Sequence, residues 1–393
     1  MFEKFCSERI KKTPSSFIRE ILKVTQNHDI ISFAGGLPNP ISFPQEELKV
    51  SMNRIADTFG AKIYQYSTTE GLESLRQFIA DRYKKNHNMD ISIDNIIITT
   101  GSQQALDLIG KVFVNEGDKV MVENPSYLGL LQAFCVYGAD FVQTKLDDDG
   151  LNIEELKKTL KEHKPKVAYL IPNFQNPTGL TYTKGNRAKV FECIKDEDMI
   201  LIQDDPYGEL KFEDDEKLPY IGVNQSKKNI YLGSFSKIVT PGMRLGYVIA
   251  DKEVIRLLET AKQAADLHSN IFGQYLIADY LLNNDLDAHI EKIKKLYKEQ
   301  AAAMVSAMKE FFPPEVKFTQ PKGGMFTWVT LREGMDVIKL FDKAIEKKVA
   351  FVPGHPFYVN PKNVNTLRLN YTNADSETIK EGIKRLSEAI KEI

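Results

Sequence analysis

The sequence has few cysteines, one tryptophan and almost no net charge. Its three cysteines among 393 residues are Cys6, Cys135 and Cys193. An odd number without paired spacing argues against a disulfide framework and fits a reducing cytoplasm, where we expect the protein to work. A formal net charge of −2 offers no basic surface to a phosphate backbone. Because the sequence also lacks helix-turn-helix and zinc-finger patterns, nucleic acid is not an expected partner.

Long apolar runs and metal-binding patterns are missing as well. No apolar segment approaches the roughly 20 residues that a membrane helix needs, and the N-terminal "MFEKFCSERIKKTPSS" lacks the apolar core of a signal peptide. The histidines form no i, i+4 pair and no cluster with cysteine, so no metal site is predicted. With an ordinary globular composition, the chain is expected to act on small molecules, away from membranes.

Between about residues 95 and 250, short β-branched runs alternate with helical patterns. The runs are "NIIITT", "KVMVEN", "KVAYLIP", "MILIQDD", "NIYLGS" and "LGYVIA". Strands separated by about 10 or more helix-patterned residues imply crossover connections. The pattern therefore predicts an α/β domain with a mostly parallel central sheet and helices on both faces.

The remainder predicts a second, smaller domain. "HIEKIKKLYKEQAAAMVSAMKEFF" is long enough to bridge two domains, and strand patterns in "GMFTWVTL" and "NTLRLNYT" are then mixed with helices, as in α+β domains. We expect an N-terminal arm and part of the small domain over residues 1–50, a large domain over 51–290 and a small C-terminal domain over 291–393. The turn-rich "IISFAGGLPNPISFP" is expected to lie as a loop or arm across another part of the chain.

Parallel sheets bind ligands beyond the carboxyl ends of their strands, so the residues after each run are informative. After "NIIITT", Gly101 permits a tight turn, and Ser102 and Gln103 stand where a helix begins, which favours a small phosphate. An ordinary N-cap would also explain Ser102. After "KVMVEN", Tyr127 offers an aromatic face or a hydroxyl, although a packed core tyrosine is at least as common.

The next strand ends carry an amide and two acids. "QNPTG" fixes a turn and holds Asn176 rigidly, although a turn alone would explain the motif. In "DDPYGEL", Asp204 and Tyr207 lie three residues apart after an apolar strand, where an acid is costly to desolvate without a cation or donor. We therefore expect a positively polarised group beside these acids.

The last of these segments surrounds one lysine with hydroxyls and glycines. In "GSFSKIVTPGMRLGYV", Lys237 precedes Arg244 by seven residues, and a solvated loop lysine would explain this segment alone. Together, however, the strand ends ask for a ligand with a phosphate, a cationic ring nitrogen, a phenolic oxygen and a carbonyl that can take a lysine. Pyridoxal phosphate has all four, which makes Lys237 its expected covalent anchor and proton carrier.

Six motifs occur in an order that closely resembles the class I and II aminotransferases of the fold-type I pyridoxal phosphate enzymes. They are "YQYSTTEG", "TTGSQQAL", "NPSYLG", "QNPTG", "DDPYGEL" and "GSFSKIVTPGMRLGYV". The resemblance runs nearly end to end and is greatest to the kynurenine/2-aminoadipate and multi-substrate aromatic branch. It implies transfer of an amino group from an aromatic or 2-aminoadipate-like L-amino acid to a 2-oxo acid such as 2-oxoglutarate, by a ping-pong mechanism.

The resemblance also implies roles in cofactor binding. Lys237 would form the Schiff base, Asp204 would pair with the pyridine nitrogen, and Tyr127 would stack on the ring. Asn176 and Tyr207 would hydrogen-bond the phenolic oxygen. The residues implied for the phosphate are Ser102, Gln103, Ser234, Arg244 and, from the neighbouring subunit of a homodimer, Tyr66.

Substrate contacts are implied at the other end of the site. Arg368 in "NTLRLNYT" matches the family's arginine for the α-carboxylate, which a guanidinium fork suits better than an ammonium, although a surface arginine is the alternative. Asn176 and Gly36 would contact the same end. Arg19 in "SSFIRE" matches an arm arginine that can meet a distal acid, although a solvated helix arginine would explain it better.

Two other functions stay open at this point. β-Elimination or α-decarboxylation would use the same Lys237, because these reactions differ only in which bond at the α carbon lies perpendicular to the cofactor ring. A non-catalytic ligand sensor, as in some transcription regulators, would need a DNA-binding domain. That function is less expected, because the chain begins directly with the arm and is nearly neutral.

Overall fold

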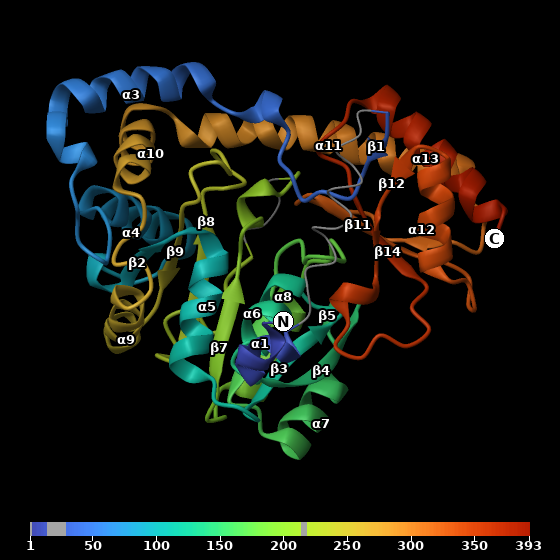
Figure 1. The fold of residues 1–393 in the computed structure, drawn as a ribbon, viewed down its shortest axis with the longest axis horizontal. Coiled ribbons are helices and arrows are strands. Elements are labelled where there is room, and N and C mark those ends of the chain that lie inside the picture. Colours follow the sequence, from blue (N-terminus) through green and yellow to red (C-terminus); the bar gives the residue numbers. More distant parts are fainter. Residues whose placement is uncertain (1, 14–28, 214–217) are drawn as a thin grey trace.

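The computed structural model describes residues 2–13, 29–213 and 218–393. Arg19, the arm residue implied for the substrate, therefore lies outside the described residues. A large sheet with helices on both faces stands beside a smaller sheet, and α11 (Leu286–Phe311) runs from one to the other (Figure 1).

The large sheet has eight strands in the order β2-β9-β8-β7-β6-β3-β4-β5. Their bounds are β2 (Ile96–Thr99), β3 (Lys119–Asn124), β4 (Asp140–Asp147), β5 (Gly150–Leu151), β6 (Val167–Leu170), β7 (Ile200–Asp204), β8 (Asn229–Ser234) and β9 (Gly246–Ile249). The neighbours from β8 through β4 pair in parallel, as predicted. Since no helix separates β8 from β9, β9 runs antiparallel to β8 and to β2.

The helices associated with this sheet bury both of its faces. They are α3 (Gln45–Phe59), α4 (Glu73–His87), α5 (Gly101–Phe113), α6 (Leu128–Cys135), α7 (Ile153–His163), α8 (Lys184–Ile194), α9 (Lys252–Gln263) and α10 (Ile271–Asn283). Successive β8 residues belong to different cores: Ile230 and Leu232 pack with α5 and α9, whereas Tyr231 packs with α4. The strands are thus apolar on both sides, and polar groups gather at their ends.

The smaller sheet is antiparallel, with the order β10-β11-β14-β13. Its strands are β10 (Lys317–Phe318), β11 (Phe326–Thr330), β13 (Val352–Pro353) and β14 (Thr366–Asn370), and its helices are α12 (Val337–Glu346) and α13 (Ser376–Lys391). β1 (Ile31–Ser32) pairs with β12 (Val349–Ala350). The turn-rich N-terminal loop therefore lies across the C-terminal part of the chain, as expected.

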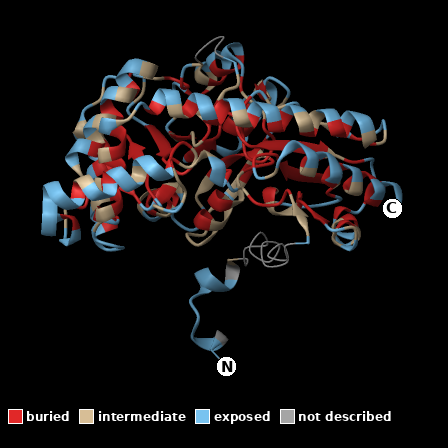
Figure 2. Cartoon of the chain, turned by 90° about the horizontal axis from the view of Figure 1, so that it is seen from above, coloured by how far each residue is buried: buried red, intermediate tan, exposed pale blue. Residues whose placement is uncertain are grey.

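Short elements complete the chain. They are α1 (Glu8–Lys12) and the 3-10 helices η1 (Glu3–Phe5), η2 (Pro40–Ser42), η3 (Gly60–Tyr64), η4 (Ile93–Asn95), η5 (Gly208–Leu210) and η6 (His355–Phe357). Figure 2 shows buried residues along the interior of both sheets and an exposed N-terminal segment that projects from the body. Within the described ranges, none of the helices combines the length and apolar character needed to cross a bilayer.

Candidate active site

The first turn of α5 lies against an arginine because Gly101 has no side chain. A Cβ at Gly101 would lie 2.6 Å from Arg244 Nη2, and the φ of Gly101, +73°, is in the left-handed region. The guanidinium of Arg244 therefore reaches the N-terminus of a helix, where backbone N–H groups have no helical partner. Ser102 and Gln103 belong to the same turn. This combination of a cation with free amides can hold a phosphate.

Two further predicted residues border this turn. The Gln103 amide donates to the Gly129 backbone oxygen at 2.9 Å, and Ser234, at the end of β8, accepts the Ser236 N–H at 3.1 Å. Tyr127 is the N-cap residue of α6. A Cβ at Gly129 would lie 2.5 Å from Tyr127 Cζ, so the glycine makes room for this ring.

Asp204 ends β7 as a buried carboxylate with one oxygen still open. Its Oδ2 accepts the hydroxyl of Tyr169 at 2.6 Å, whereas Oδ1 has no hydrogen-bond partner among the described residues. Burial raises the Asp204 pKa to about 7; the Tyr169 hydrogen bond opposes this rise and the charge of Asp205 adds to it. An open, buried carboxylate oxygen suits a cationic N–H donor such as a protonated pyridine nitrogen.

The neighbouring acid, Asp205, is already satisfied. It accepts hydrogen bonds from the Asn173 amide, the Tyr220 hydroxyl and the Gly208 N–H. The two acids therefore differ in what they can accept. Asp204 retains an oxygen for a ligand, and Asp205 fixes the turn that follows.

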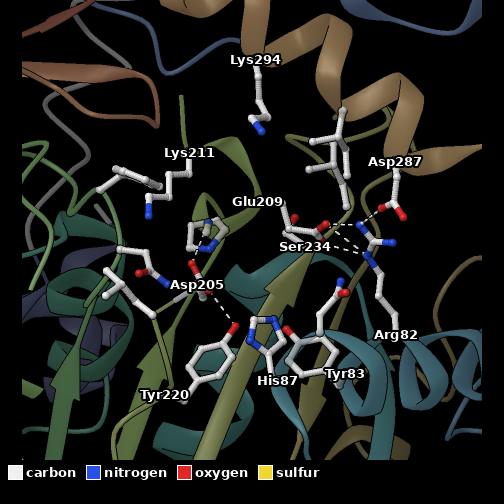
Figure 3. Close-up of a pocket in the computed structure, with 18 of the residues that line it drawn as sticks. Arg82, Tyr83, His87, Asp205, Glu209, Lys211, Tyr220, Ser234, Asp287 and Lys294 are labelled. Carbon is white, nitrogen blue, oxygen red and sulfur yellow. Dashed lines mark hydrogen bonds and ion pairs between the residues drawn. The ribbon is translucent and has the colours of Figure 1, made fainter. Parts of the chain in front are cut away.

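Asp205 also lines a separate cavity of about 370 Å³, shown in Figure 3. Several charged side chains that line this cavity pair with one another; Arg82, for example, contacts both Glu209 and Asp287. Of the predicted site residues that the structure describes, only Ser234 lines this cavity. The cavity is therefore adjacent to the predicted site but distinct from it.

Lys237 lies beside the N-terminal loop and two cations. Its Nζ donates to the Gly36 backbone oxygen at 2.9 Å. Burial, together with the charges of Arg244 and Arg368, lowers the Lys237 pKa to about 8. Since neutral amine is the nucleophilic form, this environment favours covalent chemistry near neutral pH.

Arg368 is a buried cation between two aromatic rings. Its Nη1 donates to Asn176 Oδ1 at 2.8 Å, and its Nη2 donates to the Ala34 oxygen at 3.0 Å. The guanidinium carbon lies 4.2 Å from the Phe326 ring centroid and 5.1 Å from that of Phe357. Within the described chain, Arg368 Nε has no hydrogen-bond partner and the guanidinium forms no ion pair with a carboxylate. A ligand carboxylate would supply the missing charge.

Tyr207 and Asn176 lie beside Arg368 and Phe326. The Tyr207 ring meets Phe326 edge to face at 5.8 Å. Burial raises the Tyr207 pKa, and a hydrogen bond with Asn176 opposes this effect. Asn176 thus contacts Arg368 and Tyr207 together, so one amide can orient both ends of a ligand.

The structure brings most of the predicted residues together, with two exceptions. Tyr66 is 80% exposed and its ring lies 5.7 Å from that of His268, and its side chain forms no hydrogen bond with another predicted site residue among those described. Arg19 is not described. Over the ranges that are described, no group of three or more His, Cys, Asp or Glu residues could hold a metal ion.

Sequence reasoning missed Tyr169, Phe326 and Phe357. Tyr169 is the polar residue within an otherwise apolar strand run, which is a usable signal. Phe326 and Phe357 carry no such signal, because their role depends on the position of Arg368 between them. Such contacts across distant segments cannot be read from spacing.

Comparisons with known proteins agree with the resemblance that the sequence motifs indicate. The family described as aminotransferase class I and II matches residues 42–386. The chain is 44% identical over 396 aligned residues to aromatic-amino-acid aminotransferase 1 of Thermococcus litoralis, which covers 100% of this chain and 95% of that protein. It is also similar to the crystal structure of a Pyrococcus horikoshii kynurenine aminotransferase in complex with PMP, with a TM-score of 0.95, 45% identity, and 99% and 98% of the two chains covered.

A third similar protein is LysN, an α-aminoadipate aminotransferase of Thermus thermophilus. Its crystal structure, complexed with N-(5'-phosphopyridoxyl)-L-leucine, has a TM-score of 0.93 and 39% identity to this chain, with 100% of this chain and 98% of LysN covered. The chains therefore share one fold over essentially their whole length.

Proposed function

Because this chain belongs to the class I and II aminotransferases, and is therefore a pyridoxal-phosphate-dependent aminotransferase, we propose that its amino donors are aromatic amino acids and 2-aminoadipate. The acceptor is a 2-oxo acid, with 2-oxoglutarate the first to test. Donors of these classes appear in the names of the similar proteins. The observation that carries the proposal is Arg368, a buried guanidinium that forms no ion pair with a carboxylate within the described chain and donates to Asn176.

The residues of the strand ends fit the cofactor. The open Oδ1 of Asp204 would accept from the ring nitrogen, and Asn176 and Tyr207 would contact the phenolic oxygen. Tyr127 would cover one face of the ring. The phosphate would be held by Ser102, Gln103, Ser234 and Arg244, at the helix N-terminus that Gly101 keeps open.

When bound, pyridoxal phosphate supplies an aldehyde for amino groups and a ring that withdraws electrons from the α carbon. The residues of the chain would bind and orient the substrate and move the proton. Arg368 would orient the amino acid by its carboxylate, and the Gly36 backbone, whose oxygen accepts from Lys237 Nζ, would contact the same end. Lys237, with a pKa of about 8, can take and return a proton at the α carbon near neutral pH.

A spectroscopic titration tests this function. Single amino acids are added to the cofactor-loaded protein, and 2-oxoglutarate is added last. The visible absorbance band of the cofactor should be lost when phenylalanine, tyrosine or 2-aminoadipate is added and should return with the oxo acid. The amino acid that causes this change is a donor. Initial rates should give parallel double-reciprocal lines, as in a ping-pong reaction; intersecting lines contradict the mechanism. Release of pyruvate and ammonia from a cysteine conjugate without an acceptor would indicate β-elimination instead.

The proposal includes a homodimer in which Tyr66 of one subunit completes the phosphate site of the other. The exposure of Tyr66 supports this arrangement. We also propose that the chain divides into an N-terminal arm with part of the small domain over residues 1–50, a large domain over 51–290 and a small C-terminal domain over 291–393. The three free cysteines are consistent with work in the cytoplasm.

A further inference from the structure

Glu123, at the end of β3, is a buried acid to which the proposed chemistry assigns no role. It is 0% exposed. Its Oε1 accepts the Tyr182 hydroxyl at 2.6 Å and the Ile171 N–H at 3.1 Å, and its Oε2 accepts the Gln175 amide at 3.0 Å. The hydrogen bonds are thus divided between the two oxygens, and of the described residues only Gln175 donates to Oε2.

Gln175 immediately precedes Asn176. Its Nε2 also donates to the Pro125 oxygen at 2.9 Å, and its Oε1 accepts the Thr178 N–H at 2.8 Å and the Thr178 hydroxyl at 2.7 Å. One side chain therefore ties the loop on both sides of Asn176 to the end of β3. Because Gln175 is 0% exposed, breaking these hydrogen bonds would leave buried polar atoms that water cannot reach, which lowers the stability of the fold.

From this chain of contacts we infer that Glu123 is a positioning residue, which acts through Gln175 to hold the Asn176 loop against Arg368 and Tyr207. The inference rests on the proposed function, because it concerns the amide that would meet both the substrate carboxylate and the phenolic oxygen. Glu123 itself touches neither Asn176 nor Arg368 through any of its hydrogen bonds.

The division of bonds on Glu123 allows a reciprocal experiment. In Glu123→Gln, the remaining oxygen can still accept from Ile171 and Tyr182, but the new amide faces the donor amide of Gln175. In Glu123→Gln with Gln175→Glu, donor and acceptor are exchanged, and the new carboxylate still accepts from Thr178. The double variant restores the link, but the new carboxyl must be protonated to donate to the Pro125 oxygen, which an ionised carboxylate would face as a second acceptor.

Two readouts report on Asn176 without turnover. One is the Kd of an unreactive α-methyl amino acid for the cofactor-loaded protein, measured by calorimetry. The other is the pH midpoint of the visible absorbance band of the bound cofactor, which rises when the phenolic oxygen loses a hydrogen-bond donor. We expect Glu123→Gln to raise the Kd about tenfold and the double variant to return it to within about threefold of wild type. The midpoint should rise and return in parallel.

Tyr182→Phe is the matched control, because it removes a donor from Oε1 and leaves the Gln175 bond at Oε2 intact. It should lower the thermal stability but leave the Kd and the midpoint near wild type. If Glu123→Gln does not fold, Gln175→Leu breaks the same link together with the bonds to Pro125 and Thr178, and should show the same two changes at least as strongly.

The outcomes separate the inference from the function. A wild-type protein that shows no cofactor band, or no amino transfer, contradicts the proposed function. A wild-type protein that works normally, with Glu123→Gln or Gln175→Leu changing only thermal stability, overturns the inference. Failure of the double variant to recover either readout overturns it as well.

Discussion

Arg368 Nη1 donates a hydrogen bond of 2.8 Å to Asn176 Oδ1 and thereby joins the two sheets. Arg368 lies on β14 of the smaller sheet, whereas Asn176 lies in the loop after β6 of the large one. The amide thus fixes the direction of a guanidinium that has two aromatic faces around it. A carboxylate that meets this guanidinium is placed relative to the large sheet, where Lys237 and Asp204 stand.

Replacing Arg368 with lysine should weaken amino-acid binding. An ammonium cannot present the planar fork, so the KM for the donor should rise by about 10- to 100-fold, the cost of losing a charge-assisted bond. Steady-state rates at a fixed acceptor concentration measure this. Arg332→Lys is the control, because the exposed Arg332 guanidinium donates to the backbone oxygen of Ile393 and to no other described residue. An unchanged KM in Arg368→Lys would remove Arg368 from the substrate site.

Replacing Lys237 with alanine should abolish covalent attachment of the cofactor and turnover together. Borohydride reduction followed by peptide mass spectrometry should find the cofactor mass on the Lys237 peptide of wild type. The exposed Lys161 offers a control, and Lys161→Ala should behave as wild type. Turnover by Lys237→Ala, or cofactor mass on another lysine, would contradict the assignment.

Replacing Gly101 with alanine should weaken binding of the cofactor phosphate. The new Cβ would lie 2.6 Å from Arg244 Nη2 and push the guanidinium off the helix N-terminus. Gly117→Ala is matched to it, because Gly117 has a φ of +85° but nothing within 4 Å of an added Cβ. Both variants carry backbone strain, so the difference in cofactor Kd isolates the steric contact. Equal Kd values would exclude it.

Sequence patterns predicted most of the strands that position the candidate site and missed β4 and the short strands. The β-branched runs predicted the six strands that position the site residues, because buried parallel strands need continuous apolar segments. The six runs did not include β4 (Asp140–Asp147), and the two-residue strands β1, β5, β10, β12 and β13 were not predicted, since so short a segment has no periodicity. The resemblance implied Asp204 for the pyridine nitrogen, and the open Oδ1 of this buried carboxylate is consistent with that role.

The pH dependence of stability should reveal the buried carboxyl of Asp204. Its pKa is raised to about 7 from 3.8, so the unfolded chain loses this proton at lower pH than the folded chain does. Without cofactor, the group therefore makes the protein less stable as pH rises from about 4 to about 7. The unfolding free energy of Asp204→Asn relative to wild type should increase across this window, on the order of 2 kcal/mol. Denaturant unfolding at both pH values measures it, and a constant difference would contradict the prediction.

The proposed homodimer predicts a distinct effect at Tyr66. Tyr66→Phe should raise the Kd of the cofactor several-fold, by about one hydrogen bond to phosphate. Tyr64→Phe is matched, since Tyr64 is 76% exposed and two residues away, and it should leave the Kd unchanged. Sedimentation should give twice the chain mass of 44.7 kDa. A monomer of full activity would contradict the shared site.

The contact between Arg368 and Ala34 spans 334 residues of sequence, and that between Lys237 and Gly36 spans 201. During synthesis, the large sheet can be complete while β14 is still within the ribosome. Contacts of such sequence separation form late, because loop closure must precede them. A chain that ends before β14, whether from premature termination or from proteolysis, would keep Lys237, the proposed anchor, and lack Arg368, the proposed carboxylate contact. With these proposed roles, such a fragment keeps the group that reacts with an aldehyde and lacks the group that selects an amino acid.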